Sequence, residues 1–146
     1  MTSRSLHRGF TLIELLLVIG VITILTGIVI VSVNPTKQLA DARNAQRRSD
    51  LNVILDAVYQ YSIDNNGSLP HTITTIETEI CKSGLNVDCM GMINLNLLTG
   101  AYLSGLPYDP SASTENSTKY TIVKSGNRVA LRAPEAELGM TIFITR

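Results

Sequence analysis

The side chain with the clearest chemical potential is Glu14, a carboxylate inside a long apolar segment. From Phe10 to Val33 no other side chain is charged, and seventeen of the 24 residues are Leu, Ile, Val or Phe. As a helix this segment would be about 36 Å long, enough to cross a hydrocarbon core of about 30 Å. An ionised carboxylate is costly in such surroundings unless a cation pairs with it. We therefore expect Glu14 to have a charge partner.

A short basic segment before the apolar run indicates where this cation comes from. The first nine residues carry two arginines and no acidic residue, as expected of an export signal whose positive charge stays in the cytoplasm. No well-fitting small-x-small cleavage site follows the apolar run. A cut after Gly9 would instead retain the helix and give Phe10 a free amine. That amine lies about one helical turn from Glu14, so the two charges can pair within one chain or between packed neighbours.

The segment Arg8-Gly9-Phe10-Thr11-Leu12-Ile13-Glu14-Leu15-Leu16 resembles the class III signal of type IV prepilins and of the pseudopilins of type II secretion. The resemblance implies that a membrane prepilin peptidase cuts between Gly9 and Phe10 and that the new amine of Phe10 is methylated. It also implies that the helices pack into a filament core, with Glu14 setting the register of assembly. The bland alternative is a plain single-pass anchor that contains one stray glutamate.

Length and composition limit what else the chain can do. Its 146 residues leave room for the apolar helix and one small domain. Without the two leader arginines, ten basic residues face twelve acidic ones, so the remaining net charge is about −2 and strong attraction to nucleic acid is not expected. Outside the leader, His71 is the only histidine, and no phosphate-binding loop or acid/base pair of carboxylates is recognisable. We do not expect an enzyme.

Residues 34–66 read as an amphipathic continuation of the spine helix. Asn34 and Pro35 allow the helix to restart or to kink at their position. Apolar residues then follow at the helical spacing i, i+3, i+4, i+7, namely Leu51, Ile54, Leu55 and Val58. We expect one helix, kinked near Pro35, with its second half carrying a globular domain.

The expected fold class is α+β: the long N-terminal helix, half membrane-spanning and half amphipathic, packs on a small C-terminal antiparallel sheet, as in pilins. The predicted segments are 1–9 leader peptide, 10–33 transmembrane or filament-core helix, 34–66 amphipathic continuation, 67–118 variable loop region and 119–146 antiparallel sheet. Within the loop region, 93–98 fits either a strand, by its alternation, or a short helix that continues to Leu103, and we favour the helix over 93–103. The predicted strands are 119–124, 128–132 and 140–145.

Cys81 and Cys89 enclose seven residues, among them turn-forming Gly and Asn. In an exported domain disulfides persist, so we predict that these cysteines are bonded to each other. Free thiols and a metal site are the alternatives. The metal alternative lacks further ligands, because His71 is the only histidine outside the leader.

Asp109 and Glu115 bracket a loop rich in Ser, Thr and Asn oxygens, which is chemically suitable for calcium. Major pseudopilins bind calcium in a C-terminal loop, but their ligand pattern is not matched closely enough to be transferred to this sequence. We therefore interpret the loop as an acidic surface loop, with Asp109 and Glu115 as weak metal candidates. No other cofactor is expected.

Arg43, Arg47 and Arg48 form a basic cluster just beyond the apolar run. Such a cluster can contact acidic patches of neighbouring subunits, lipid headgroups or DNA. The preferred interpretation is a solvated face paired with Asp50 and with acids of other subunits. DNA is not an expected partner.

Together these features predict a structural subunit of a type IV pilus-like filament. We expect a single-pass protein of the inner (cytoplasmic) membrane that is later built into an extracellular or periplasmic filament. The expected partners are other copies of itself, prepilin peptidase, an inner-membrane assembly platform and motor, and membrane lipid before assembly. The alternatives are a major-type pseudopilin of a type II protein secretion system and a membrane-tethered domain that does not polymerise.

Overall fold

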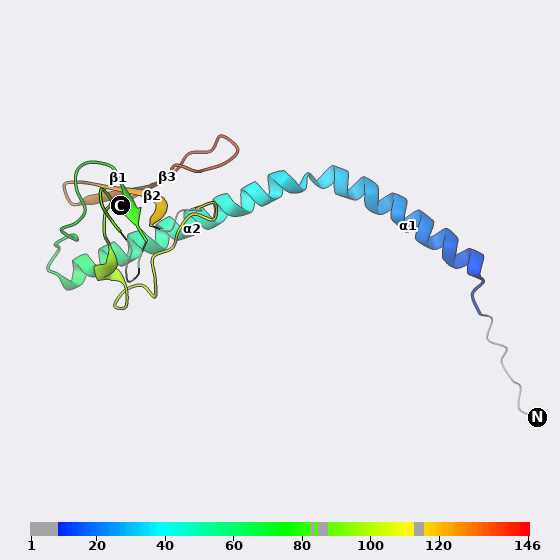
Figure 1. Cartoon of the computed structure of the whole chain (residues 1–146), viewed down its shortest axis with the longest axis horizontal. Helices are drawn as coiled ribbons and strands as arrows, with labels where there is room; N and C mark the ends of the chain where they lie inside the picture. The colour runs from blue at the N-terminus through cyan, green and yellow to red at the C-terminus, as the bar shows by residue number, and fades with distance from the viewer. Residues whose placement is uncertain (1–8, 83, 85–87, 113–115) are drawn as a thin grey trace, which may run out of the picture. The chain divides into compact units, whose positions relative to one another are not determined.

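The computed structural model describes residues 9–82, 84, 88–112 and 116–146. Its elements, shown in Figure 1, are α1 (Leu12–Val33), α2 (Pro35–Asp64), β1 (Thr78–Cys81), the 3-10 turn η1 (Asn96–Leu98), β2 (Ser117–Ser125), β3 (Arg128–Ala133) and β4 (Ile142–Thr145). The chain divides into two compact units, one ending at Gln38 and one beginning at Leu39. The fold is α+β and pilin-like, with two helices followed by a small antiparallel sheet, as predicted.

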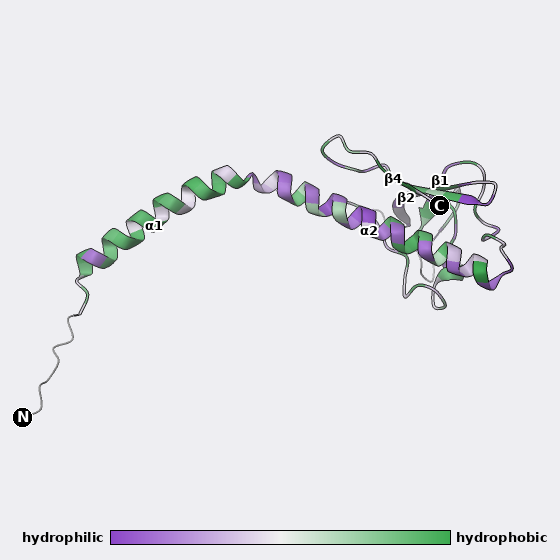
Figure 2. Cartoon of the chain, turned by 180° about the vertical axis from the view of Figure 1, so that it is seen from behind, coloured by the Kyte–Doolittle hydropathy of each residue, from purple (hydrophilic) through white to green (hydrophobic). Residues whose placement is uncertain are grey.

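The first unit contains α1, which is apolar around its whole circumference (Figure 2). None of its residues is buried. The two threonines inside the helix satisfy their own hydroxyls: Thr23 donates to the carbonyl oxygen of Ile19 at 2.7 Å, and Thr26 to that of Ile22 at 2.8 Å. With these groups satisfied, α1 presents an almost purely hydrocarbon surface.

Asn34 separates α1 from α2, where a single kinked helix was expected. Its backbone is left-handed, with φ 45° and ψ 74°, and this ends α1. Its side-chain oxygen then accepts hydrogen bonds from the hydroxyl of Thr36 at 3.0 Å and from the backbone N–H of Lys37 at 3.3 Å. Asn34 is therefore the N-cap of α2, and Pro35 occupies the first helical position, where its missing N–H costs nothing. A break replaces the kink because Asn tolerates positive φ.

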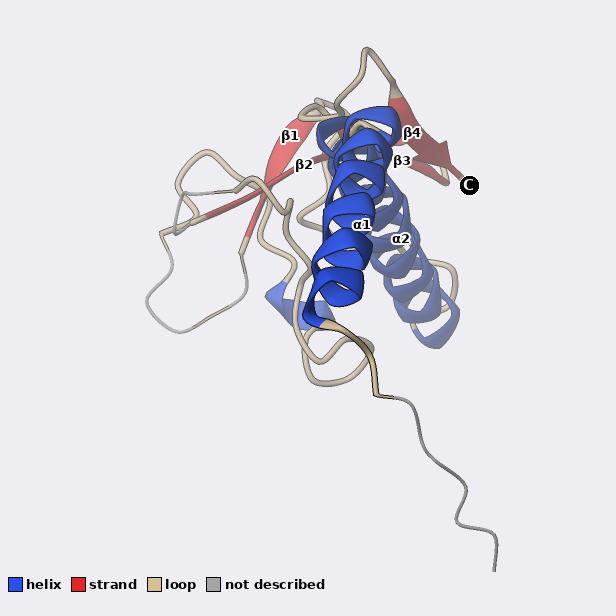
Figure 3. Ribbon diagram, turned by 90° about the vertical axis from the view of Figure 1, so that its right-hand side faces the viewer, coloured by secondary structure: helices blue, strands red, loops and turns tan. Residues whose placement is uncertain are grey.

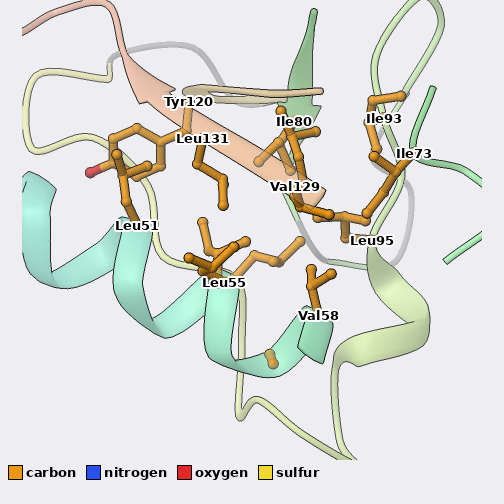
Figure 4. Packing of buried hydrophobic residues seen from close by; sticks show 14 of the residues in the cluster. Leu51, Leu55, Val58, Ile73, Ile80, Ile93, Leu95, Tyr120, Val129 and Leu131 are labelled. Atoms are coloured by element: carbon orange, nitrogen blue, oxygen red, sulfur yellow. The ribbon is translucent and has the colours of Figure 1, made fainter. Parts of the chain in front are cut away.

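The second unit has one hydrophobic core between α2 and the sheet (Figure 4). The helix contributes Leu51, Ile54, Leu55 and Val58, all at most 2% exposed, so the predicted apolar stripe is the core face. The sheet and loops contribute Ile73, Ile80, Ile93, Leu95, Tyr120, Ile122, Val129 and Leu131. Each fully buried Leu or Val stabilises the fold by roughly 1.5–3 kcal/mol, so this core positions everything else in the unit.

The sheet has the order β1-β2-β3-β4 with antiparallel neighbours (Figure 3). The three predicted strands correspond to β2, β3 and β4. The turn between β2 and β3 has Gly126 at φ 61°, a positive value that suits glycine at the first turn position of a hairpin. Strand β1 lies in the predicted loop region and was missed, because four residues pairing with a strand far along the sequence leave no clear local pattern.

The predicted helix over 93–103 is wrong apart from η1. Ile93 is extended and joins the outer edge of β1: its N–H donates to the carbonyl of Glu79 at 2.8 Å, and its carbonyl accepts from Cys81 at 2.9 Å. Gly100 has φ 89°, which stops any helix from continuing. Pairing with β1 therefore overrides the local helical preference of this leucine-rich stretch.

Candidate assembly helix and charge network

Glu14 lies in the first turn of α1, and its carboxylate turns back toward the amino end of the helix. Its Oε2 accepts hydrogen bonds from the backbone N–H and from the hydroxyl of Thr11, both at 2.8 Å. In return the N–H of Glu14 donates to Oγ1 of Thr11 at 3.3 Å. This capping box satisfies donors that the start of a helix leaves free. Among the described residues no cation pairs with Glu14.

The helix that carries Glu14 is long and apolar enough to cross a membrane. It has 22 residues and a mean hydropathy of 2.9, and the described part of the chain contains no second helix of this kind. At 1.5 Å per residue its length is about 33 Å, which matches a hydrocarbon core of about 30 Å. The carboxylate therefore lies at one end of the span, where a charge is tolerated more easily than at the centre.

Comparisons with known proteins identify this segment. The profile of the prokaryotic N-terminal methylation motif matches residues 4–30. Type II secretion system core protein G of Escherichia coli (strain K12) is 28% identical over 149 residues, which cover 99% of this chain and 94% of that protein. The chain is therefore pilin-like, with the prepilin-type motif and near full-length similarity to a type II secretion pseudopilin. No solved structure is matched by the pilin-like chain.

Pilins and pseudopilins are structural subunits of polymerising filaments, and this pilin-like chain is a filament subunit. The apolar N-terminal helix fits a membrane-anchored subunit. The predicted superfamily and its function at this level are therefore confirmed.

The pilin-like domain also contains a buried ion pair that the sequence did not reveal. Arg47 and Asp109 are both 0% exposed. The guanidinium meets the carboxylate through two parallel bonds, Nε to Oδ2 at 2.6 Å and Nη2 to Oδ1 at 3.0 Å. Oδ1 also accepts hydrogen bonds from the N–H and hydroxyl of Ser111, at 2.8 and 2.5 Å. This bidentate geometry fastens the loop before β2 to the middle of α2.

A second, partly exposed pair fastens the loop between β3 and β4 to the same helix. Arg43 donates to both carboxylate oxygens of Glu137, at 2.8 and 2.7 Å. The side-chain amide of Asn44 brackets the backbone of Glu137, donating to its carbonyl and accepting from its N–H, each at 3.0 Å. Nη1 of Arg47 donates to the same Asn44 oxygen at 2.9 Å, so the two pairs form one network.

The network shifts the pKa values of its acids in a consistent direction. Burial alone would raise the pKa of Asp109, but the hydrogen bonds from Arg47 and Ser111 outweigh it, and the pKa lies below its usual value. The hydrogen bonds from Arg43 likewise lower the pKa of Glu137. Both carboxylates are therefore ionised at neutral pH.

Asp50 behaves differently, although it lies on the same helix. Its carboxylate accepts a hydrogen bond from the hydroxyl of Tyr120 at 2.7 Å. Desolvation raises the pKa of Asp50, and the hydrogen bond from Tyr120 only partly opposes this effect. Burial, followed by the bond to Asp50, raises the pKa of the Tyr120 phenol. Asp50 thus pairs with a phenol, and not with the basic cluster as expected.

The arginine cluster was expected to be a solvated basic face, and this expectation is wrong. Arg47 is fully buried against Asp109, and Arg43 is held by Glu137. Arg48 is exposed, with Nη2 at 3.6 Å from the sulfur of Met140. These arginines hold the domain together internally, so two of the three are not available to bind DNA or lipid headgroups.

Of the two weak metal candidates, the structure describes only Asp109. Both oxygens of Asp109 already accept hydrogen bonds, and Glu115 lies outside the described residues. No group of three potential metal-ligating acids, histidines or cysteines occurs in the part of the chain that the structure describes. His71 is exposed in a turn.

Cys81 and Cys89 form a disulfide, with Cα atoms 5.4 Å apart. The bond ties the end of β1 to the segment that leads to Ile93, the residue that pairs along the outer edge of β1. A disulfide here limits the opening of this sheet edge. The disulfide therefore has a structural role in the domain, and neither cysteine belongs to the charge network.

Proposed function

We propose that this chain is cut between Gly9 and Phe10, methylated on the new amine of Phe10, and assembled through α1 into a type IV pilus-like filament. The observation that carries the proposal is the position of Glu14. Its carboxylate faces the amino end of α1, where a Phe10 amine would lie, and it lacks a cation among the described residues. The match of residues 4–30 to the methylation motif supports the same processing. We assign the chain no catalytic activity.

The physical logic of assembly follows from the surface of α1. In a bilayer its apolar surface contacts lipid, and in a filament it contacts the α1 helices of neighbouring subunits. Apolar packing alone does not select one register, because nearly every side chain around α1 is alike. A Glu14 carboxylate and a neighbouring Phe10 ammonium do select one, since any other register leaves two charges unpaired in apolar surroundings.

This route implies a defined set of partners. Prepilin peptidase would cut and methylate the chain, and membrane lipid would surround α1 before assembly. An inner-membrane platform with its motor would then extract the subunits into an extracellular or periplasmic filament. The partner in the filament itself is another copy of this chain.

Two variants separate the charge of Glu14 from its capping role. Glu14→Gln keeps an oxygen for the Thr11 donors but removes the charge, so we expect insertion and processing to remain normal while filament yield falls strongly. Thr11→Val removes the capping hydroxyl but keeps the charge, so we expect nearly normal filaments. Yield is measured as subunit in the filament fraction relative to processed subunit in membranes. The reverse pattern, with normal filaments from Glu14→Gln, would sink the charge-register proposal.

A second candidate is a major-type pseudopilin of type II secretion. The near full-length similarity to type II secretion system core protein G supports it. In that case deletion of the chain should block release of a secreted protein, and the filament should stay in the periplasm. A surface pilus predicts instead that the processed subunit is recovered from the medium after shearing, with secretion unaffected.

A further inference from the structure

Several charged side chains make no ion pair among the described residues, and those near the two ends of β3 differ in sign. Among the described residues, Lys124 and Arg128 at the β2–β3 hairpin make no ion pair, and Glu135 in the loop between β3 and β4 makes none either. By contrast, Arg132 and Lys119 on the same sheet are paired with Glu77 and Glu79. Near β3 the unpaired charges are thus basic at the hairpin and acidic in the loop beyond the other end, while Asp41 and Arg48 are unpaired on α2.

The basic surface is named the tip patch and consists of Ile76, Lys124 and Arg128. The backbone N–H of Lys124 donates to the carbonyl of Thr74 at 2.9 Å, which places the segment leading to Ile76 beside the hairpin. Ile76 is 73% exposed, and Arg128 is exposed where β3 leaves the turn. The tip patch therefore combines two cations with one exposed aliphatic side chain.

The acidic surface is named the loop patch and consists of Glu135, Glu137 and Leu138. The loop projects from the sheet (Figure 1), and the bonds of Arg43 and Asn44 to Glu137 fasten it to α2. Leu138 is 49% exposed and has φ 59°, so an aliphatic side chain is displayed from a backbone conformation that leucine rarely adopts. Glu137 is already paired with Arg43 and Arg47, so the unpaired charge of this patch is that of Glu135, opposite in sign to the tip patch and near the exposed Leu138.

The two patches lie at opposite ends of the domain. The loop patch is held at Asn44 of α2, whereas the hairpin tip is held at Tyr59, whose hydroxyl donates to the carbonyl of Asn127 at 3.4 Å. Fifteen helical residues correspond to about 22 Å along α2. A contact between the patches is therefore possible only between two copies of the chain that are displaced along the helix direction.

We propose that the tip patch of one subunit docks on the loop patch of the next copy in the filament. Lys124 and Arg128 would face Glu135 and the exposed edge of Glu137, while Ile76 and Leu138 would exclude water beside them. Because the two surfaces differ, the contact is heterologous, the type that builds an open filament when its rotation does not close into a ring. This inference rests on the proposed function, since it needs a polymer, but it adds a specific contact that the packing of α1 does not imply.

Cysteine cross-linking in assembled filaments tests the contact directly. Ser125→Cys and Pro134→Cys place one thiol beside each patch without removing its charged or aliphatic side chains. In the double variant, oxidation should give a ladder of cross-linked multimers, and each single variant should give none. The matched control combines Ser125→Cys with Ala45→Cys, an exposed position of α2 at the level of the loop patch. It should give no ladder.

Charge reversal provides the second measurement on the full-length chain. Lys124→Glu with Arg128→Glu should lower filament yield by roughly tenfold or more, because like charges then face each other across the contact. The unfolding midpoint should change little, since neither side chain makes an ion pair among the described residues. Adding Glu135→Arg to this variant should restore part of the yield, whereas Glu135→Arg alone should lower it.

The outcomes separate this inference from the proposed function. Normal filaments without a ladder from the double-cysteine variant, or a ladder from the Ala45→Cys control as well, would overturn the docking contact and leave the proposed function standing. Failure of the unmodified processed chain to form filaments would contradict both.

Discussion

Glu14 in α1 and Arg47 in α2 are both single charges on helix faces that are otherwise apolar, but their surroundings differ. Arg47 is fully buried and has every part of its guanidinium matched by Asp109, Asn44 and Ser111. Glu14 is exposed and bonded only to the neutral donors of Thr11. One charge is thus satisfied inside the subunit, and the other has no cation partner among the described residues.

This difference indicates that the two helices have different roles, one in the stability of the subunit and one in association. The buried face of α2 packs against core residues of the same chain and pairs with Asp109, so α2 stabilises the subunit. No residue of α1 is buried by the described chain, so its apolar surface is free for association with other molecules. Changes to the charge in α2 should therefore affect folding, and changes to the charge in α1 should affect assembly without affecting folding.

The largest expected effect is on the buried pair. Asp109→Ala leaves the buried Arg47 guanidinium with only the more distant Glu137 carboxylate, 3.5 Å away, and should lower the free energy of unfolding by about 3 kcal/mol. Replacing both partners, as Arg47→Met with Asp109→Leu, removes the unpaired charge and should recover most of this loss. Denaturant unfolding of the full chain in detergent micelles, followed by circular dichroism, measures both. A double variant no more stable than Asp109→Ala would show that the pair is not the cause.

The next effect is the response of the domain to acid. Because the folded-state pKa values of Asp109 and Glu137 are lowered, the stability they contribute is complete above the usual carboxylate range and is lost as pH falls below about 4. The raised pKa of Asp50 acts oppositely, since its protonation on mild acidification favours the folded state. The unfolding midpoint between pH 7 and pH 3 should therefore rise slightly and then fall. Asp50→Asn should remove the rise alone, and a midpoint that increases down to pH 3 would contradict the account.

A smaller loss of stability is expected from breaking the partly exposed pair of Arg43 and Glu137. Glu137→Gln keeps oxygen and nitrogen atoms near Arg43 but removes the charge, and the backbone of this residue stays bracketed by Asn44. The loss of stability should therefore be clearly smaller than that of Asp109→Ala, because solvent already screens the pair. The same denaturant titration decides this, and equal losses from the two variants would mean that burial does not set the difference.

The smallest expected effect on folding is none at all, from Glu14→Gln. Among the described residues the carboxylate accepts hydrogen bonds only from Thr11 and makes no ion pair, so the unfolding midpoint of the domain should equal that of the unmodified chain. A lowered midpoint would show that Glu14 stabilises the subunit, and the contrast between the two helices would disappear.

The features that could be predicted from the sequence are the local ones, which depend on residues close together in the chain. The apolar run, the methylation-motif segment, the stripe from Leu51 to Val58 and the Gly126 hairpin are patterns of neighbouring residues, and each was predictable. Strand β1 and the extended Ile93 depend on pairing with segments far along the chain, so their own residues did not reveal them.

The buried pair was missed for a different reason. Continued backward at helical spacing, the stripe that contains Leu51 reaches Arg47 and Asn44, so the pattern did indicate a buried position. The charge of Arg47 argued against burial, and its partner Asp109 lies 62 residues away in a loop. A charged residue in register with an apolar stripe should therefore be read as a possible buried ion pair, to be matched with a distant acid.

The measurement that tests the central claim most directly is the mass of the N-terminal peptide from the assembled material and from membranes. Our account predicts a peptide that begins at Phe10 and carries one added methyl group, found both in membranes and in the filament fraction. A chain that still begins at Met1 in cells with an active prepilin peptidase would contradict it, because α1 would then be a plain anchor and Glu14 would have no Phe10 amine to meet.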